Sequence, residues 1–119
     1  MADDTIQDSQ ITASSSISPM WVPNWAPHDG RLNQNTAWST HASNYEQWIQ
    51  VALNTDHFVY GVQTQGHVDA WTKSFKVGYS QDGGTTWQYI NGENGQPKVR
   101  YFGNHRGCPL PHVATPSTE

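Results

Sequence analysis

An Asp-Gly pair between two segments of alternating hydrophobicity dominates the choice of fold class. KSFKVGYS (residues 73–80) and TTWQYI (residues 85–90) alternate apolar and polar side chains, as a half-buried strand does, and Asp82-Gly83 lies between them. Such a pair between alternating segments is a strong signal for a β-hairpin. No segment keeps an apolar period of 3.6 residues, so the sequence predicts an all-β fold with little helix.

Three more segments are predicted to be strands. QWIQVAL (residues 47–53) alternates, HFVYGVQTQG (residues 57–66) is rich in β-branched and aromatic residues, and KVRYF (residues 98–102) follows Asn-Gly pairs that predict a turn. By contrast, residues 16–33, SISPMWVPNWAPHDGRLN, contain three prolines, each of which removes a backbone donor and fixes φ. This segment is predicted to be a loop although it carries large apolar side chains: Met20, Trp21, Val22 and Trp25.

The composition favours one extracellular domain and excludes nucleic acid as a partner. A length of 119 residues fits a single domain, and a charged fraction of 13% with six Trp and five Tyr suits an aromatic-rich β-domain. The formal net charge is -4, and the six Lys and Arg residues are too scattered to form a basic stripe.

The first residues, MADDTIQD, have neither the basic nor the apolar region of a signal peptide, and no apolar run could span a bilayer. We therefore expect either a piece of a longer secreted protein or export without a signal. Cys108 is the only cysteine, which excludes an internal disulfide and leaves a thiol that could pair with a second chain.

Several short fragments occur in the order and spacing of one known family. They are ITASSS from Ile11, GRLN from Gly30, AW at Ala37, QWIQVAL from Gln47, TQG from Thr64, FKVGYSQDGGTTW from Phe75 and FGN from Phe102. With them the chain resembles the coagulation factor V/VIII type C domain, also called the discoidin domain, from Ile6 to about Asn104. The resemblance implies a galactose-binding-like jelly-roll β-sandwich, whose loops at one end form spikes that grip a ligand. It also implies a non-enzymatic adhesion or recognition module for phospholipid, glycan, collagen or other proteins.

The chain departs from the family pattern in ways that affect stability. Ala52 stands where the family usually has an acidic residue, His67 where it has Arg, and the first of its paired cysteines is absent. After Asn104 the family continues with an apolar segment and a final strand, which this sequence does not match. We therefore expect a discoidin domain at residues 1–107 that lacks its C-terminal strands, followed by an irregular tail at 108–119. An open edge of this kind implies low stability unless a second chain covers it, and predicts a dimer through that edge or through Cys108.

Three loops are candidates for ligand binding. In the first, Met20 and Trp21 occupy the region of a family spike with Val22 beside them, and they either protrude or fold back over the end of the sandwich. Trp25 in the same loop, and Trp71 in the third, are expected to be buried. The second loop (residues 39–47) and the third (residues 65–71) contribute polar and aromatic candidates: His41, Asn44 and Tyr45, then His67 and Asp69.

The loops favour glycan or protein over anionic phospholipid. A charged membrane surface attracts basic groups, and only Arg31 and Lys73 lie near the candidate loops. Glycan recognition instead asks for an aromatic surface with Asn, Gln, His and Asp side chains, which these loops supply. Phospholipid binding by insertion of Met20 and Trp21 is the alternative, and a structural, self-associating role is a third.

Neither catalysis nor a strong metal site is indicated by the motifs. The sequence has no nucleophile elbow, zinc motif or P-loop, so an enzyme is not expected. Asp29, Asn35 and Thr36 follow the order of oxygen ligands that hold structural Ca²⁺ in related galactose-binding sandwiches, although the spacing differs. They are the candidate metal ligands, and a partial set of oxygens would bind Ca²⁺ weakly.

Overall fold

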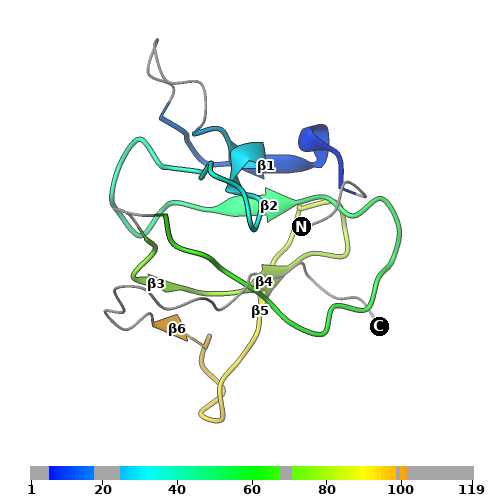
Figure 1. Cartoon of the computed structure of the whole chain (residues 1–119). Coiled ribbons are helices and arrows are strands. Elements are labelled where there is room, and N and C mark those ends of the chain that lie inside the picture. The colour runs from blue at the N-terminus through cyan, green and yellow to red at the C-terminus, as the bar shows by residue number, and fades with distance from the viewer. Residues whose placement is uncertain (1–5, 18–24, 68–70, 99, 102–119) are drawn as a thin grey trace. The chain divides into compact units, whose positions relative to one another are not determined.

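The computed structural model describes residues 6–17, 25–67, 71–98 and 100–101, and it divides into two compact units between Asn54 and Thr55. The regular structure in these ranges consists of antiparallel strands and short 3-10 turns (Figure 1). No helix in the described part of the chain is long and apolar enough to cross a membrane. The prediction of an all-β fold with little helix is confirmed.

In the first unit, β1 (Ile11–Ala13) pairs antiparallel with β2 (Ile49–Val51), and Figure 1 shows the two arrows side by side. Ile11 lies opposite Val51 in this register. β2 falls within the segment predicted from its alternation, but it is only three residues long. Ile11 is buried, which is the result expected when one face of a short strand pair is covered.

Two 3-10 turns flank this strand pair, η1 (Asp8–Gln10) and η2 (Pro27–Gly30). Pro27 suits the first position of η2, because its missing N–H would have no partner there and its φ is already fixed. The carboxylate of Asp29 accepts the Ala26 N–H at 2.8 Å, which closes the start of the turn. The proline-rich segment therefore ends in a defined turn.

Close packing next to η2 depends on Gly30. A Cβ at this position would lie 3.1 Å from Trp38 Cβ and 3.7 Å from Ile49 Cδ1, so a side chain here would fit only if the tryptophan moved by a few tenths of an ångström. Leu32 follows two residues later and is buried. Trp25, which was expected to be buried, is half-buried.

The second unit contains two strand pairs. β3 (Ser74–Phe75) pairs antiparallel with β6 (Arg100–Tyr101), and β4 (Gly78–Tyr79) pairs with β5 (Gln88–Tyr89). KSFKVGYS was predicted as one strand, yet it changes partner between its two halves. The structure therefore corrects one long strand to two short ones.

The predicted hairpin is confirmed, with a longer loop than a two-residue turn. Asp82 organises this loop: its carboxylate accepts the N–H groups of Thr85 and Thr86 at 3.1 and 2.9 Å and the hydroxyls of Thr86 and Ser80. These hydrogen bonds, led by that from the Thr86 hydroxyl, hold the pKa of Asp82 well below its ordinary value. Gly83 and Gly84 have φ of 70° and 88°, a region where side chains are strained.

A second turn follows β5, as the Asn-Gly pairs predicted. Asn91 and Pro97 form an isolated antiparallel bridge, and the Gly92 N–H donates to Gln96 O at 2.9 Å. Gly95 has a φ of 73°, so it is the residue that permits the chain to reverse.

Two sequence predictions in the second unit are wrong. Residues 57–66 were predicted to be a strand, but none of them belongs to a strand or bridge. Trp71 was expected in the core, and 52% of its surface is exposed. The C-terminal tail, 108–119, and the boundary at residue 107 lie outside the described residues, so that domain division stays a prediction.

Candidate functional site

The loop of residues 39–47, here called the Tyr45 loop, is fastened to the chain that leaves β1. The Ser15 hydroxyl donates to Gln47 Oε1 at 2.6 Å and accepts the His41 N–H at 3.2 Å. The Ser14 hydroxyl donates to the same oxygen of Gln47 at 2.9 Å. Contacts near both ends of the loop therefore reach one short segment, and this limits how far the loop can move.

Two tryptophans flank the Tyr45 loop with different exposure. Trp38 is half-buried and donates its indole N–H to Ser15 O at 2.9 Å. Trp48 exposes half of its surface, while its backbone N–H donates to Ser14 Oγ at 3.0 Å and its carbonyl accepts the Ser14 N–H at 2.9 Å. The backbone contact continues the β1–β2 pairing up to the end of the loop.

Asn44 shapes the tip of the loop and leaves Tyr45 in solvent. The side-chain oxygen of Asn44 accepts the Glu46 N–H at 3.0 Å and the Gln47 amide N–H at 2.8 Å, which is the bonding of an Asx turn. Tyr45 stands on this turn and is fully exposed. Its ring offers a flat apolar surface, and its hydroxyl can donate or accept a hydrogen bond.

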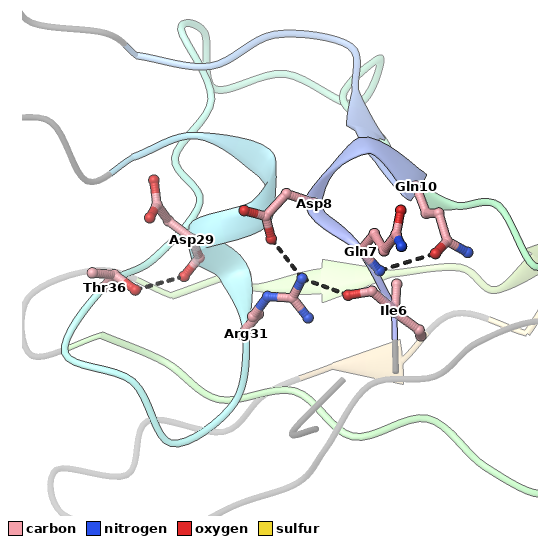
Figure 2. A network of polar contacts seen from close by, with 7 residues as sticks. All are labelled: Ile6, Gln7, Asp8, Gln10, Asp29, Arg31 and Thr36. Carbon is pink, nitrogen blue, oxygen red and sulfur yellow. Dashed lines mark hydrogen bonds and ion pairs between the residues drawn. The ribbon is translucent and has the colours of Figure 1, made fainter. Parts of the chain in front are cut away.

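The predicted metal ligands form contacts within their own loop (Figure 2). The Thr36 hydroxyl donates to the carbonyl oxygen of Asp29 at 3.0 Å, and one carboxylate oxygen of Asp29 is already used by Ala26. Asn35 is exposed. Among the described residues, no group of three or more His, Cys, Asp and Glu side chains could hold a metal ion. A Ca²⁺ site at Asp29, Asn35 and Thr36 stays a prediction.

Arg31 holds the N-terminal segment against η2 (Figure 2). Its Nη2 donates to the carbonyl of Ile6 and to the carboxylate of Asp8, both at 2.6 Å, and its side chain is largely buried. The hydrogen bond from Arg31 lowers the pKa of Asp8. Arg31, one of the two cations that lie near the candidate loops in the sequence, therefore makes contacts within the protein that stabilise the fold.

Some of the predicted ligand-binding residues lie in one loop, and others belong to a different unit of the structure. His41, Asn44 and Tyr45 share one loop of the first unit, where His41 and Tyr45 are exposed. His67 belongs to the second unit, is half-buried and takes part in an isolated bridge. Met20, Trp21, Val22 and Asp69 lie outside the described residues.

Sequence reasoning missed the Ser14–Ser15–Gln47 contact that positions the loop. The run of three serines at residues 14–16 was the available signal, because such side chains bond readily to nearby backbone and amide groups. Sequence reasoning also did not foresee that the oxygen of the Asn44 side chain caps the turn, and ligand contact by Asn44 stays a prediction.

The comparison with known families decides the identity of this domain. The F5/8 type C domain matches residues 10–106, which is most of the chain. The chain belongs to the F5/8 type C domain family. F5/8 type C domains are β-sandwiches and non-catalytic binding modules, so the predicted family, the all-β sandwich class and the absence of enzymatic activity are confirmed.

The F5/8 type C relatives are much longer proteins. Lactadherin from Rattus norvegicus is 38% identical over 108 residues, which are 83% of this chain and 25% of that protein. Coagulation factor VIII from Canis lupus familiaris is 34% identical over 118 residues, 93% of this chain and 5% of that protein. Retinoschisin from Takifugu rubripes is 29% identical over 118 residues, 94% of this chain and 42% of that protein. The chain thus spans a minor part of each of these relatives.

Proposed function

We propose that this F5/8 type C domain is an extracellular recognition module that binds a cell-surface glycan or protein through the Tyr45 loop. The observation that carries the proposal is the full exposure of Tyr45 on a turn fixed by Asn44 and fastened through Ser15. A rigid exposed aromatic gives contact area with little loss of conformational freedom on binding. Loops held on a stable scaffold are also where binding residues concentrate.

The groups around Tyr45 support a polar ligand. The His41 ring, the free amide nitrogen of Asn44 and the carboxylate of Glu46 are exposed on the same loop. Residues 39–47 contain no Lys or Arg, so the loop offers no fixed positive charge to a phosphate headgroup. An aromatic surface with hydrogen-bonding neighbours fits a sugar or a polar protein surface better than an anionic lipid.

Phospholipid binding is the second candidate, and the exposed pair Tyr45 and Trp48 favours it. Both side chains combine an apolar ring with a polar group, as residues at membrane interfaces do. In this alternative Met20, Trp21 and Val22 would enter the acyl region, each large apolar side chain contributing about 1.5–3 kcal/mol. Contacts from His67 and Asp69 are predictions for either ligand class.

A glycan array and liposome flotation, run on the same preparations, test the proposal. We expect the 119-residue chain to bind glycan or an immobilised cell-surface protein, and Tyr45→Ala to weaken this binding by about tenfold, the effect of a central aromatic contact. Tyr60→Ala is the matched control, because Tyr60 is another exposed tyrosine but lies in the second unit.

Three outcomes would contradict this assignment. Equal binding by Tyr45→Ala and Tyr60→Ala would remove the Tyr45 loop from the site. Flotation with anionic liposomes that is lost in Met20→Ala and Trp21→Ala, without glycan or protein binding, would establish the phospholipid alternative. Self-association through Cys108 or an open strand edge, with no binding of glycan, protein or lipid, would leave the domain with a structural role.

A further inference from the structure

The turn of residues 91–97, here called the Asn94 turn, contains two Asn-Gly pairs. They are Asn91-Gly92 and Asn94-Gly95, and no other asparagine of the sequence precedes a glycine. An asparagine in this position can lose its side-chain amide spontaneously. The backbone nitrogen of the next residue attacks its Cγ, and a glycine has no side chain to hinder the approach. The two pairs share this intrinsic chemistry, so their surroundings decide which of them reacts.

The Asn91-Gly92 pair lies at the neck of the Asn94 turn, where the backbone is paired. Asn91 belongs to the antiparallel bridge that closes the turn, and the Gly92 N–H donates to Gln96 O at 2.9 Å. Just outside the bridge the Lys98 N–H donates to Ile90 O at 2.8 Å. The Gly92 nitrogen can therefore attack only after several paired residues have separated together, which makes the reactive conformation rare.

The Asn94-Gly95 pair lies at the tip of the same turn, where opening is local. Both residues are exposed, and the Gly95 N–H donates to Gly92 O at 3.0 Å within the turn itself. Gly95 has a φ of 73°, and a glycine can leave this conformation for another with little steric cost. Breaking one hydrogen bond at an exposed turn releases the Gly95 nitrogen and leaves the neck intact.

The space around the two glycines differs in the same sense. A Cβ built on Gly92 would lie 3.3 Å from Asn94 Oδ1 and 3.8 Å from Gln96 O. A Cβ built on Gly95 would have no heavy atom within 4 Å. The reaction moves a backbone nitrogen onto the neighbouring side chain and then admits a water molecule, so it needs open space. That space is present beside Gly95.

The side chain of Asn94 is also prepared for attack. Its Oδ1 accepts the Gln96 N–H at 3.2 Å. Attack at Cγ places negative charge on this oxygen, and a backbone N–H already directed at the oxygen stabilises that charge as it develops. No hydrogen bond to the Asn91 side chain occurs among the described residues.

We propose that Asn94 is a site of spontaneous covalent modification and that the fold protects Asn91 from the same reaction. The Gly95 nitrogen loses its proton to water and bonds to Asn94 Cγ. The Cγ–Nδ2 bond then breaks, and Nδ2 takes up a proton and leaves as ammonia. Water adds to either carbonyl carbon of the resulting cyclic succinimide, the bond from that carbon to the Gly95 nitrogen breaks, and the nitrogen regains a proton. The products are aspartate and isoaspartate, and the sequence of steps needs no oxidant or reductant.

The two products change the Asn94 turn in different ways. Aspartate keeps an oxygen that can accept the Gln96 N–H, and it adds a negative charge beside the exposed Glu93. Isoaspartate places an additional carbon atom in the backbone at the tip, which displaces Gly95 from Gly92 O. The turn between β5 and β6 therefore changes with the age of the protein, in the unit that does not carry the Tyr45 loop.

Ageing of the intact chain at neutral pH, followed by mass spectrometry, tests the proposal. Glu93 lies between the two pairs, so cleavage after this residue places them in different peptides. The exchange of an amide NH₂ for OH raises the mass of the peptide that has reacted. We expect Asn94 to react about tenfold faster than Asn91, or more, and part of its product to be isoaspartate.

The same measurement in urea is the control, because it removes the fold and keeps the local sequence. The two rates should then become similar. Equal rates in the folded chain, or faster loss at Asn91, would overturn the proposal. A tenfold difference that persists in urea would also overturn it, because the fold would not be its cause.

A matched pair of variants tests the protection at the neck. Lys98→Pro removes the N–H that donates to Ile90 O, whereas Lys98→Ala removes the side chain and keeps that N–H. We expect Lys98→Pro to speed the reaction at Asn91 towards its rate in urea and to leave Asn94 nearly unchanged. Lys98→Ala should leave both rates unchanged. An unchanged rate at Asn91 in Lys98→Pro would overturn the proposed protection.

Discussion

The exposed side chain of Asp82 orders the loop between β4 and β5. Its carboxylate accepts hydrogen bonds from two threonines and a serine, although it lies in solvent. The hydrogen bonds to its carboxylate are stronger when that group is ionised, because a charged acceptor binds N–H and O–H donors more tightly. The loop should therefore respond to acid in a predictable direction.

We expect the loop between β4 and β5 to stay ordered as the pH falls to 3.8, the ordinary pKa of aspartate, and to lose order below it. A carboxylate whose pKa is lowered by folding stabilises the fold above its unfolded pKa, and this contribution disappears as the pH falls towards the folded pKa. The amide chemical shifts of Thr85 and Thr86 follow the change. In Asp82→Asn the same shifts should be displaced at neutral pH and lose this dependence on acid. An unchanged titration in that variant would show that another group is responsible.

Gly30 gives a second prediction at the level of a single residue. Gly30→Ala places a methyl group 3.1 Å from Trp38 Cβ, an atom held close to the backbone, and should lower the free energy of unfolding by about 1–3 kcal/mol. Gly61→Ala adds the same methyl group in open space and should change stability by less than about 1 kcal/mol. Denaturant unfolding of both variants makes the comparison, and equal effects would contradict the close packing at η2.

At the level of elements, the Tyr45 loop depends on β1 for its position. The strand pair β1–β2 is short, but the hydroxyls that follow it reach across to the loop. The loop is thus held in place by side chains that come from a distant part of the sequence. Substitution of these serines should loosen the loop and leave the strands intact.

We expect Ser15→Ala to speed amide hydrogen exchange at His41 by about fivefold, the effect of one lost hydrogen bond of about 1 kcal/mol. Ligand binding should weaken in the same variant because the loop would have to be ordered on binding. Ser16→Ala is the control, since Ser16 has the same side chain one residue later. Unchanged exchange at His41 in Ser15→Ala would show that the contact does not hold the loop.

The elements that the sequence predicts correctly are those defined by local signals. Asp82-Gly83 and the Asn-Gly pairs produce turns where they occur, because the conformations they favour are set within a few residues. The strand predicted at residues 57–66 fails for the opposite reason: its residues favour strands, but a strand also needs a partner from elsewhere in the chain.

The sequence predicts which loop carries the candidate site, but it does not predict the role of each residue in that loop. A polar connection at residues 39–47 indicates a surface loop, but sequence alone does not distinguish Asn44, which caps the turn, from Tyr45, which protrudes. Arg31 gives the same lesson, since its partners Ile6 and Asp8 are more than twenty residues away.

At the level of the whole molecule, the part of the hydrophobic core that lies in the described residues is small. Ile11 and Leu32 are the buried hydrophobic residues in the described ranges, while several aromatic side chains of the second unit are exposed. Burial of apolar surface is the main favourable contribution to folding, and here much of that surface remains in water. The isolated chain should therefore be marginally stable.

We expect the 119-residue chain to unfold at a low denaturant concentration, because little apolar surface is buried among its described residues. Urea unfolding followed by tryptophan fluorescence measures the midpoint. A sharp unfolding transition at high temperature in a monomer would contradict the expected low stability.

The Tyr45 loop contains no Lys or Arg, and the nearby Arg31 is neutralised within the fold. Attraction between exposed charges fades as ionic strength rises, with a screening length of about 10 Å at 0.1 M salt. Contacts made by the Tyr45 ring and by the neutral Asn44 amide do not weaken in this way as salt is added. A column carrying the ligand of this loop should therefore retain the domain through a salt gradient and release it only to free competing ligand.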